Sequence, residues 1–253
     1  MLRVAVAGTA GAALAGGAVY ATRGERGTDS PRMTELSAAQ LLHRAADRSR
    51  AEGVRLPVPR NDQYVYTRNF ITRTYAEGGR RKTWTDESWI SVDGSRPSRR
   101  EEYGKVHNDP PLGEDEVMWP PTEYAKLAKW PTDPDELLKR LRMQRPGADL
   151  EAFSNACQFF VVPRVMPPGL EAATFEAVAW IPGFRSDREA VDALGRRGVA
   201  VTYPKLTYSF IFDSQTYAYL GLRLTGSNGG RDKYREMRSR AVIAVVDRIG
   251  QRP

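Results

Sequence analysis

The stretch QYVYTRNFITRTYAEGGRRKTWTDESWISV, residues 63–92, decides the fold of this chain. Aromatic and β-branched residues alternate with polar ones in 63–75 and again in 82–92, as strands with one solvated face require. Gly78 and Gly79 lie between the two runs and suit a tight turn. The stretch predicts an antiparallel hairpin, because a connection this short cannot join parallel strands.

A third strand is expected directly after this hairpin. Asp93-Gly94 follows ESWISV and precedes SRPSRREEY, and an Asp-Gly pair between strand sequences is a strong hairpin signal. Because side chains alternate along a strand, Trp84 and Ile90 share one face of the predicted meander and Trp89 takes the other. Packing in a core is the simpler interpretation of these aromatic residues, and a binding wall is the alternative.

Composition limits the function classes that the chain can belong to. The 253 residues carry a formal charge of +7, from 38 Lys and Arg against 31 Asp and Glu, but the basic residues are scattered among acidic neighbours. No nucleic-acid partner is therefore predicted, since such proteins gather their charge into a patch. One Cys and two His leave little material for a disulfide framework or a metal centre, and no cofactor is expected. Nor does the sequence contain a G-x-S-x-G, H-E-x-x-H or S-x-x-K element, so we predict no catalytic activity.

The first residues suggest a membrane segment. Residues 4–22 carry no charge and consist mainly of Ala, Gly and Val. As a helix they would span roughly 28 Å, about the thickness of a hydrocarbon core. We expect residues 1–22 to be a transmembrane anchor that leaves the bulk of the chain extracytoplasmic; the alternative is a signal peptide cleaved after Ala21. Residues 23–33 are then a linker, and residues 34–253 a single extracytoplasmic domain and a monomer.

Local start signals place the helices of that domain. Ser37 with Gln40 three residues later forms a capping box, so a helix should begin at Ser37. Asp133 is the expected N-cap of another helix, with Pro134 at its first position. Cys157 is expected to be a small buried hydrophobic residue. A short helix is predicted after Pro120-Pro121, through Lys129, and two more helices over 148–162 and 168–180. Residues 105–116 are predicted to be an irregular loop.

In the last third of the chain, apolar and polar residues again alternate, which is the pattern of a strand. In the segment 206–213, Phe210 and Phe212 lie on one face with Leu206 and Tyr208. Residues 227–240 are predicted to be a long exposed loop. Five strands are predicted in this part, over 190–194, 199–203, 206–213, 217–224 and 241–247. The fold class that follows is α+β, with an N-terminal membrane helix and then a curved antiparallel sheet packed against a helical block.

Several strings resemble those of an uncharacterised actinobacterial-type family of membrane-anchored proteins that are often encoded beside extracytoplasmic-function sigma factors. The strings are VPRNDQYVYTR, DESWISVDGSR, WPTDPDELLKRLR, FDSQTYAYLGLRL and AVVDRIGQRP. The resemblance runs from about Ser37 to the C-terminus. It implies a link to sigma-factor signalling and brings no functional residues, because the family has no established activity. The order of elements is also similar to the half-open β-barrels of lipoprotein carriers and periplasmic sigma regulators.

That similarity gives the candidate site. It implies that one face of the sheet, marked by Trp84, Ile90, Phe210 and Phe212, lines a groove for an apolar ligand; the alternative is that helices fill it permanently. We expect a membrane-anchored extracytoplasmic binding or sensory domain for an unknown ligand or envelope protein partner. A signal-cleaved carrier of a lipid or another apolar ligand is the alternative.

Overall fold

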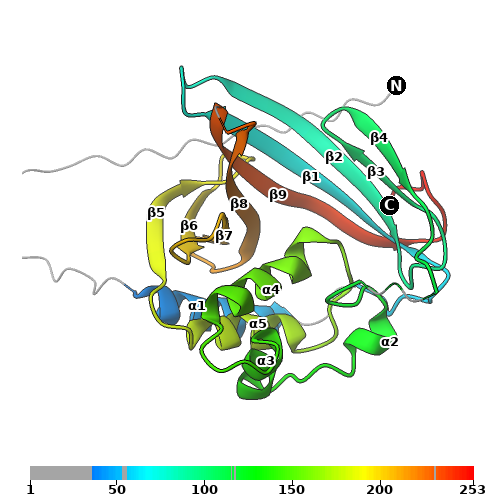
Figure 1. The fold of residues 1–253 in the computed structure, drawn as a ribbon, viewed down its shortest axis with the longest axis horizontal. Coiled ribbons are helices and arrows are strands. Elements are labelled where there is room, and N and C mark those ends of the chain that lie inside the picture. Colours follow the sequence, from blue (N-terminus) through cyan, green and yellow to red (C-terminus); the bar gives the residue numbers. More distant parts are fainter. Residues whose placement is uncertain (1–35, 53–55, 115, 117, 231) are drawn as a thin grey trace, which may run out of the picture. The chain divides into compact units, whose positions relative to one another are not determined.

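A nine-stranded antiparallel sheet organises the part of the chain that the structure, a computed structural model, describes: residues 36–52, 56–114, 116, 118–230 and 232–253. The order of strands across the sheet is β4-β3-β2-β1-β9-β8-β7-β6-β5 (Figure 1). Its strands are β1 (Tyr64–Tyr75), β2 (Arg81–Ser91), β3 (Ser98–Glu102), β4 (Lys105–Asp109), β5 (Arg185–Val191), β6 (Arg197–Thr202), β7 (Tyr208–Asp213), β8 (Tyr219–Asn228) and β9 (Asp232–Val246). The predicted large antiparallel sheet is confirmed.

The meander at the start of the domain has the predicted connectivity. Strands β1 and β2 pair from Tyr64↔Ser91 to Thr74↔Arg81, and β2 pairs with β3 after the turn that contains Gly94. Strand β9 returns from the far end of the chain and pairs with β1 on one side and β8 on the other. The first and last strands of the domain are thus central neighbours in the sheet.

Helices cover one face of the sheet, which we call the inner face. Figure 1 shows them gathered on that side of the curved sheet. They are α1 (Ala38–Glu52), α2 (Tyr124–Leu127), α3 (Pro134–Leu141), α4 (Asp149–Val161) and α5 (Leu170–Ala179). Apolar side chains of α1, α3, α4 and α5 pack with those of β6, β7 and β8 in the largest core cluster. Burial of this continuous apolar surface is the main stabilising term of the fold.

The predicted helix starts are confirmed by their caps. The Ser37 N–H donates to Gln40 Oε1 at 2.8 Å, and the Gln40 N–H donates to Ser37 Oγ at 3.2 Å, which is the reciprocal pair of a capping box. The N–H groups of Asp135 and Glu136 both donate to Asp133 Oδ1 at 3.0 Å. Cys157 is fully buried within α4, as expected.

Two predicted loops are wrong, and both mistakes concern charged strands. Residues 105–109 form β4, which turns back from β3 through Tyr103-Gly104 with positive φ at both residues, as a tight hairpin requires. In place of a long loop over 227–240, β8 continues to Asn228 and β9 begins at Asp232. Polar composition hid these strands, in which Asp109 of β4 pairs with Arg100 of β3 and Glu236 of β9 pairs with Arg73 of β1.

A smaller apolar cluster lies on the outer face. Trp89 packs there against Tyr66 with ring centroids 5.3 Å apart, and its indole N–H donates to the Gln251 carbonyl oxygen at 2.7 Å. Arg252 donates to the Glu87 carboxylate beside it. The last residues of the chain therefore cover the face of the sheet that the helices leave open.

The predicted membrane helix or signal peptide (1–22) and the linker (23–33) lie outside the described residues. Among the helices that the structure does describe, none combines the length and the apolar character needed to cross a bilayer.

Candidate functional site

A cavity of about 480 Å³ lies on the inner face of the sheet. Strands β1, β2, β3, β8 and β9 form its floor. The residues at the end of α4, 160–163, and the loop around Leu112 and Met118 form its opposite wall. Its volume falls within the roughly 300–1,000 Å³ that is typical of small-molecule sites.

Part of the cavity lining is aliphatic. It includes Leu222 and Leu224 of β8, Ile90 of β2 and Val161 at the C-terminal end of α4. Such a surface gains free energy by contact with a hydrocarbon group, at about 25 cal/mol per Å² removed from water.

Between the levels of Ile90 and Leu222 in the sheet, the floor of the cavity carries a row of polar residues on three adjacent strands. Asn69 of β1 pairs in register with Asp86 of β2 and with Arg240 of β9, so the three residues occupy neighbouring positions on the inner face. All three line the cavity. We call Asp86, Asn69 and Arg240 the polar row.

Asp86 is a buried carboxylate with an incomplete set of partners. Its side chain is only 4 % exposed, and Oδ1 accepts a hydrogen bond from the Tyr103 N–H at 3.0 Å. Oδ2 has no hydrogen-bond partner among the described residues, and neither has the indole Nε1 of Trp84 on the same face of β2. Burial raises the pKa of the Asp86 carboxyl, and the Tyr103 N–H, the charge of Arg238 and a weak interaction with the Trp84 indole offset part of that rise.

Arg240 forms no salt bridge with an acidic side chain among the described residues. Its guanidinium lies over the Tyr219 ring, 5.6 Å from the centroid, and makes no hydrogen bond or salt bridge to the residues that the structure describes. Its charge acts at longer range on Glu171 of α5, whose pKa is raised by burial and lowered in part by Arg240.

The other arginines of the cavity are paired. Arg100 donates to both oxygens of Asp109, at 2.7 and 3.0 Å, and this contact is the main cause of the lowered pKa of Asp109. Arg238 donates to Glu236 Oε1 at 2.6 Å and to the Tyr103 hydroxyl at 2.6 Å. Both of these arginines therefore have acidic hydrogen-bond partners within the protein.

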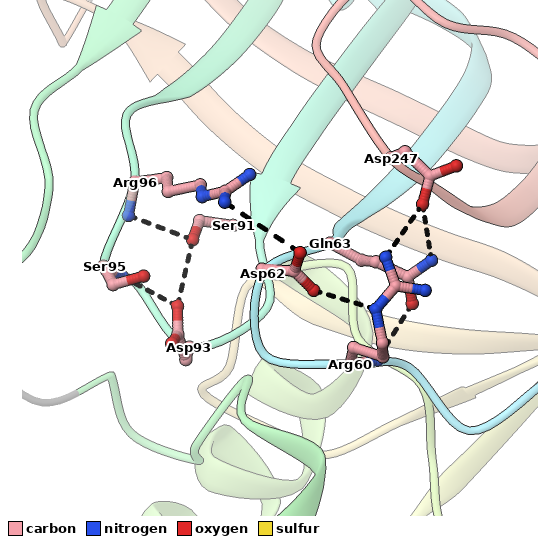
Figure 2. A network of polar contacts seen from close by, with 8 residues as sticks. All are labelled: Arg60, Asp62, Gln63, Ser91, Asp93, Ser95, Arg96 and Asp247. Atoms are coloured by element: carbon pink, nitrogen blue, oxygen red, sulfur yellow. Dashed lines mark hydrogen bonds and ion pairs between the residues drawn. The ribbon is translucent and has the colours of Figure 1, made fainter.

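Arg96 belongs to a polar network that fixes one end of the sheet (Figure 2). Its guanidinium lies 3.9 Å from Asp62, and Asp62 also accepts from Arg60 at 3.0 Å. Arg60 and Gln63 both donate to Asp247 at the end of β9, at 3.2 and 2.8 Å. In the turn between β2 and β3, Asp93 Oδ1 accepts from the Ser95 N–H at 2.9 Å. The network ties the beginning of β1, the β2–β3 turn and the end of β9 together beside the cavity.

A buried arginine holds the opposite wall. Arg164 is 3 % exposed and donates to the backbone carbonyls of Gln158 and Val162 at the end of α4 and of Pro120 and Pro121 in the preceding loop. A cation at a helix C-terminus complements the helix dipole. Burial lowers the pKa of Arg164 to about 9, so the side chain stays charged at neutral pH.

The four residues predicted for the site lie on the inner face but do not form one groove. Phe210 and Phe212 are fully buried under the helices, where Phe175 lies 5.7 and 5.1 Å from them between ring centroids. Trp84 packs against Tyr103, with centroids 5.3 Å apart, and does not line the cavity. Ile90 does line it. Helices therefore fill the Phe210 end of the face, and the cavity lies farther along the sheet.

Sequence reasoning did not single out the polar row. Asp86 offered a signal, since it stands between Trp84 and Ile90 on the face predicted to be apolar. Asn69 and Arg240 offered none, because their place beside Asp86 follows from the pairing of strands that are far apart in sequence.

Comparison with known proteins finds no protein-family model and no curated protein that matches this chain. In the described part of the chain, no group of three or more His, Cys, Asp or Glu side chains is placed to hold a metal ion. The site is thus defined by its shape, its apolar wall and its polar row.

Proposed function

We propose that this chain is a membrane-anchored extracytoplasmic domain that binds an amphipathic small molecule in the cavity on the inner face of its sheet. The observation that carries the proposal is that one cavity is lined both by aliphatic side chains and by the polar row. An apolar chain against Leu222 and Leu224 and a polar group against the row would satisfy both kinds of lining at once. The anchor and a role in sigma-factor signalling rest on the sequence and on the family resemblance.

Photolabelling of the wild type and of a variant whose cavity is filled by a larger side chain tests the proposal. The full chain in membrane vesicles is exposed to a photoactivatable alkyl phosphate, and the crosslinked peptides are identified by mass spectrometry. Labelling should concentrate on the wall residues, Val161 and Leu222 among them. Leu224→Trp, which adds bulk inside the cavity, should reduce this labelling about tenfold, the equivalent of about 1.4 kcal/mol of binding free energy.

The matched control is Val191→Trp on the edge strand β5, where the side chain is exposed and lies outside the cavity. This variant should label like the wild type. Equal labelling of both variants, or labelling spread evenly over the surface, would rule out the cavity as the binding site.

The second candidate is a signal-cleaved carrier of the same kind of ligand, favoured by the A-x-A-like residues 19–21. Mass spectrometry of the N-terminus after cell fractionation separates the two. We expect an intact N-terminus in the membrane fraction, whereas a soluble protein that begins at Thr22 would replace the anchored domain with the carrier.

A further inference from the structure

We propose that the edge strand β4 is a docking surface for a second copy of this chain. Two copies pair along β4 in antiparallel orientation across a two-fold axis at His107, so that their sheets join into one. The dimer replaces the monomer predicted from the sequence, and it does not depend on the ligand of the cavity.

Strand β4 has a free edge in the part of the chain that the structure describes. It is the last strand in the order of the sheet and pairs only with β3 there (Figure 1). Its residues 105–108 are exposed. An edge strand of this kind presents unpaired backbone groups, onto which another strand can add.

The hairpin turn fixes which backbone groups of β4 bond to β3. Tyr103 and Gly104 both have positive φ and form a two-residue turn, so Glu102 and Lys105 on either side of it are a hydrogen-bonded pair. Such pairs alternate with non-hydrogen-bonded ones along an antiparallel ladder. Every second residue from Lys105 onward therefore directs its N–H and C=O groups toward β3.

The intervening residues, Val106 and Asn108, direct these groups away from the sheet, and no described residue bonds to them. In an antiparallel pair centred on His107, Val106 of one copy lies opposite Asn108 of the other. Each residue of such a pair both donates to the other and accepts from it. The two-fold axis repeats the pair on the other side of His107, so the free backbone groups of both residues are satisfied.

Charge complementarity favours this register. With His107 on the axis, Lys105 of each copy lies opposite Asp109 of the other, on the same face of the joined sheet. Lys105 makes no salt bridge with the described residues, and the Asp109 side chain keeps 40 % of its surface exposed beside Arg100. A pair centred on Val106 would instead set Lys105 opposite His107 and gain no ion pair.

The opposite edge of the sheet, β5, is not suited to the same contact. A register shift between Asp187 and Ala190 interrupts its pairing, and Arg188 donates to the Leu36 carbonyl oxygen at 2.9 Å. Bulges of this kind keep edge strands from pairing with other chains. Strand β4 pairs with β3 without a register shift, so its edge is regular.

The symmetry suits two chains that are anchored in one membrane. A two-fold axis perpendicular to the joined sheet leaves the inner faces of both copies on the same side, and α1 packs on that side in each. A five-residue strand buries less surface than a standard interface, so the contact is weak between free chains. Confinement to one membrane raises the local concentration of the chains and favours the dimer.

Cysteine cross-linking of the full chain in the expressing cells tests the pairing. Cys157 is buried and the sequence has no other Cys, so an introduced thiol has no partner in its own chain. In the non-hydrogen-bonded pair on the axis, the Cα atoms of the two copies lie about 4.5 Å apart, a distance that a disulfide can span. His107→Cys should give a covalent dimer under mild oxidation, which a non-reducing gel shows.

Val106→Cys and Asn108→Cys are the matched controls on the same strand. Each of these residues is displaced by two positions from its own copy across the axis, so the Cα atoms lie about 8 Å apart, too far for a disulfide. Either variant should give about tenfold less dimer than His107→Cys. No dimer from His107→Cys, equal yields from the three variants, or a higher yield from Val106→Cys would overturn the pairing.

Charge reversal on the His107→Cys background tests the ion pairs. Lys105→Glu sets like charges opposite each other at both contacts and should reduce the dimer about tenfold, the equivalent of about 1.4 kcal/mol. Lys82→Glu is the matched control, because it makes the same change of charge on β2, away from the free edge, and should leave the yield unchanged.

Asp109→Lys on the same background should also reduce the dimer. When tagged Lys105→Glu chains are expressed with Asp109→Lys chains, opposite charges face each other at both contacts, so the mixed dimer should return to the yield of His107→Cys alone. Thermal melting shows whether each variant is folded. If Asp109→Lys does not fold without its contact to Arg100, Lys105→Glu and the cysteine series decide. A mixed dimer that stays weak although both variants are folded would contradict the register.

Discussion

At the scale of single residues, Asp86 is expected to reduce the stability of the folded chain. Burial raises its pKa, so the folded state binds the proton more tightly than the unfolded state does. Ionisation therefore costs stability as the pH rises from the unfolded pKa, about 3.9, through the folded one, and the cost is fully present above the folded pKa. Asp86→Asn should raise the free energy of unfolding at pH 7, and the difference from the wild type should shrink toward pH 3. Urea denaturation at several pH values measures it.

Asp109 provides a control of opposite sign. Hydrogen bonds from Arg100 are the main reason that its pKa is lowered, so its ionised form is favoured in the folded state. Asp109→Asn should lose stability at neutral pH and approach the wild type in acid, where both carboxyls are protonated. An Asp86→Asn variant that loses stability at pH 7 in the same way would show that this carboxylate is already satisfied within the protein.

At the scale of secondary-structure elements, the capping box makes the start of α1 a defined stabilising contact. The Ser37 hydroxyl accepts from the Gln40 N–H, a backbone donor that would otherwise lack an intrahelical partner. Ser37→Ala should lower the free energy of unfolding by about 1 kcal/mol. Ser214→Ala in the exposed turn between β7 and β8 should stay within about 0.5 kcal/mol of the wild type. Equal effects of the two substitutions in urea denaturation would contradict a role for the cap.

The secondary-structure elements differ in how well the sequence predicts them. The β1–β2 hairpin and the starts of α1 and α3 depend on residues that are close in sequence, so the sequence alone predicts them. The first half of β9 depends on distant partners: Arg73 of β1 donates to Glu236 of β9 at 2.8 Å and lies over the Tyr234 ring, 4.0 Å from its centroid. A charged segment satisfied in this way looks like a loop in the sequence alone.

The candidate site was harder to predict than the fold. The apolar alternation of 206–213 correctly placed Phe210 and Phe212 on one face, yet alternation cannot tell a surface covered by helices from one that borders a cavity. That distinction depends on where α4 ends, and Arg164 fixes this end through contacts with the Pro120-Pro121 segment. The polar row, in turn, depends on the registers of β1 with β2 and with β9.

At the scale of the whole molecule, Cys157 reports on global unfolding. The thiol is fully buried in the main core, and burial raises its pKa well above the usual value, so almost no reactive thiolate is present. A thiol reagent such as dithionitrobenzoate should label it only at urea concentrations that unfold the chain. Because the sequence holds a single Cys, a reducing agent should leave the melting temperature unchanged. Rapid labelling under native conditions would mean that α4 opens without the rest of the domain.

The central position of β9 affects how the chain folds as it is synthesised. Strand β1 ends at Tyr75 and β9 begins at Asp232, so more than 150 residues separate two strands that pair with each other. At roughly 5–20 residues per second, a ribosome needs about 8–30 s to make that interval. During this time β1 exposes an unpaired edge, and β8 adds a second one once it has been made, shortly before β9. Such edges invite pairing with other chains. The nascent chain therefore has to be kept apart from its neighbours until its last strand has emerged.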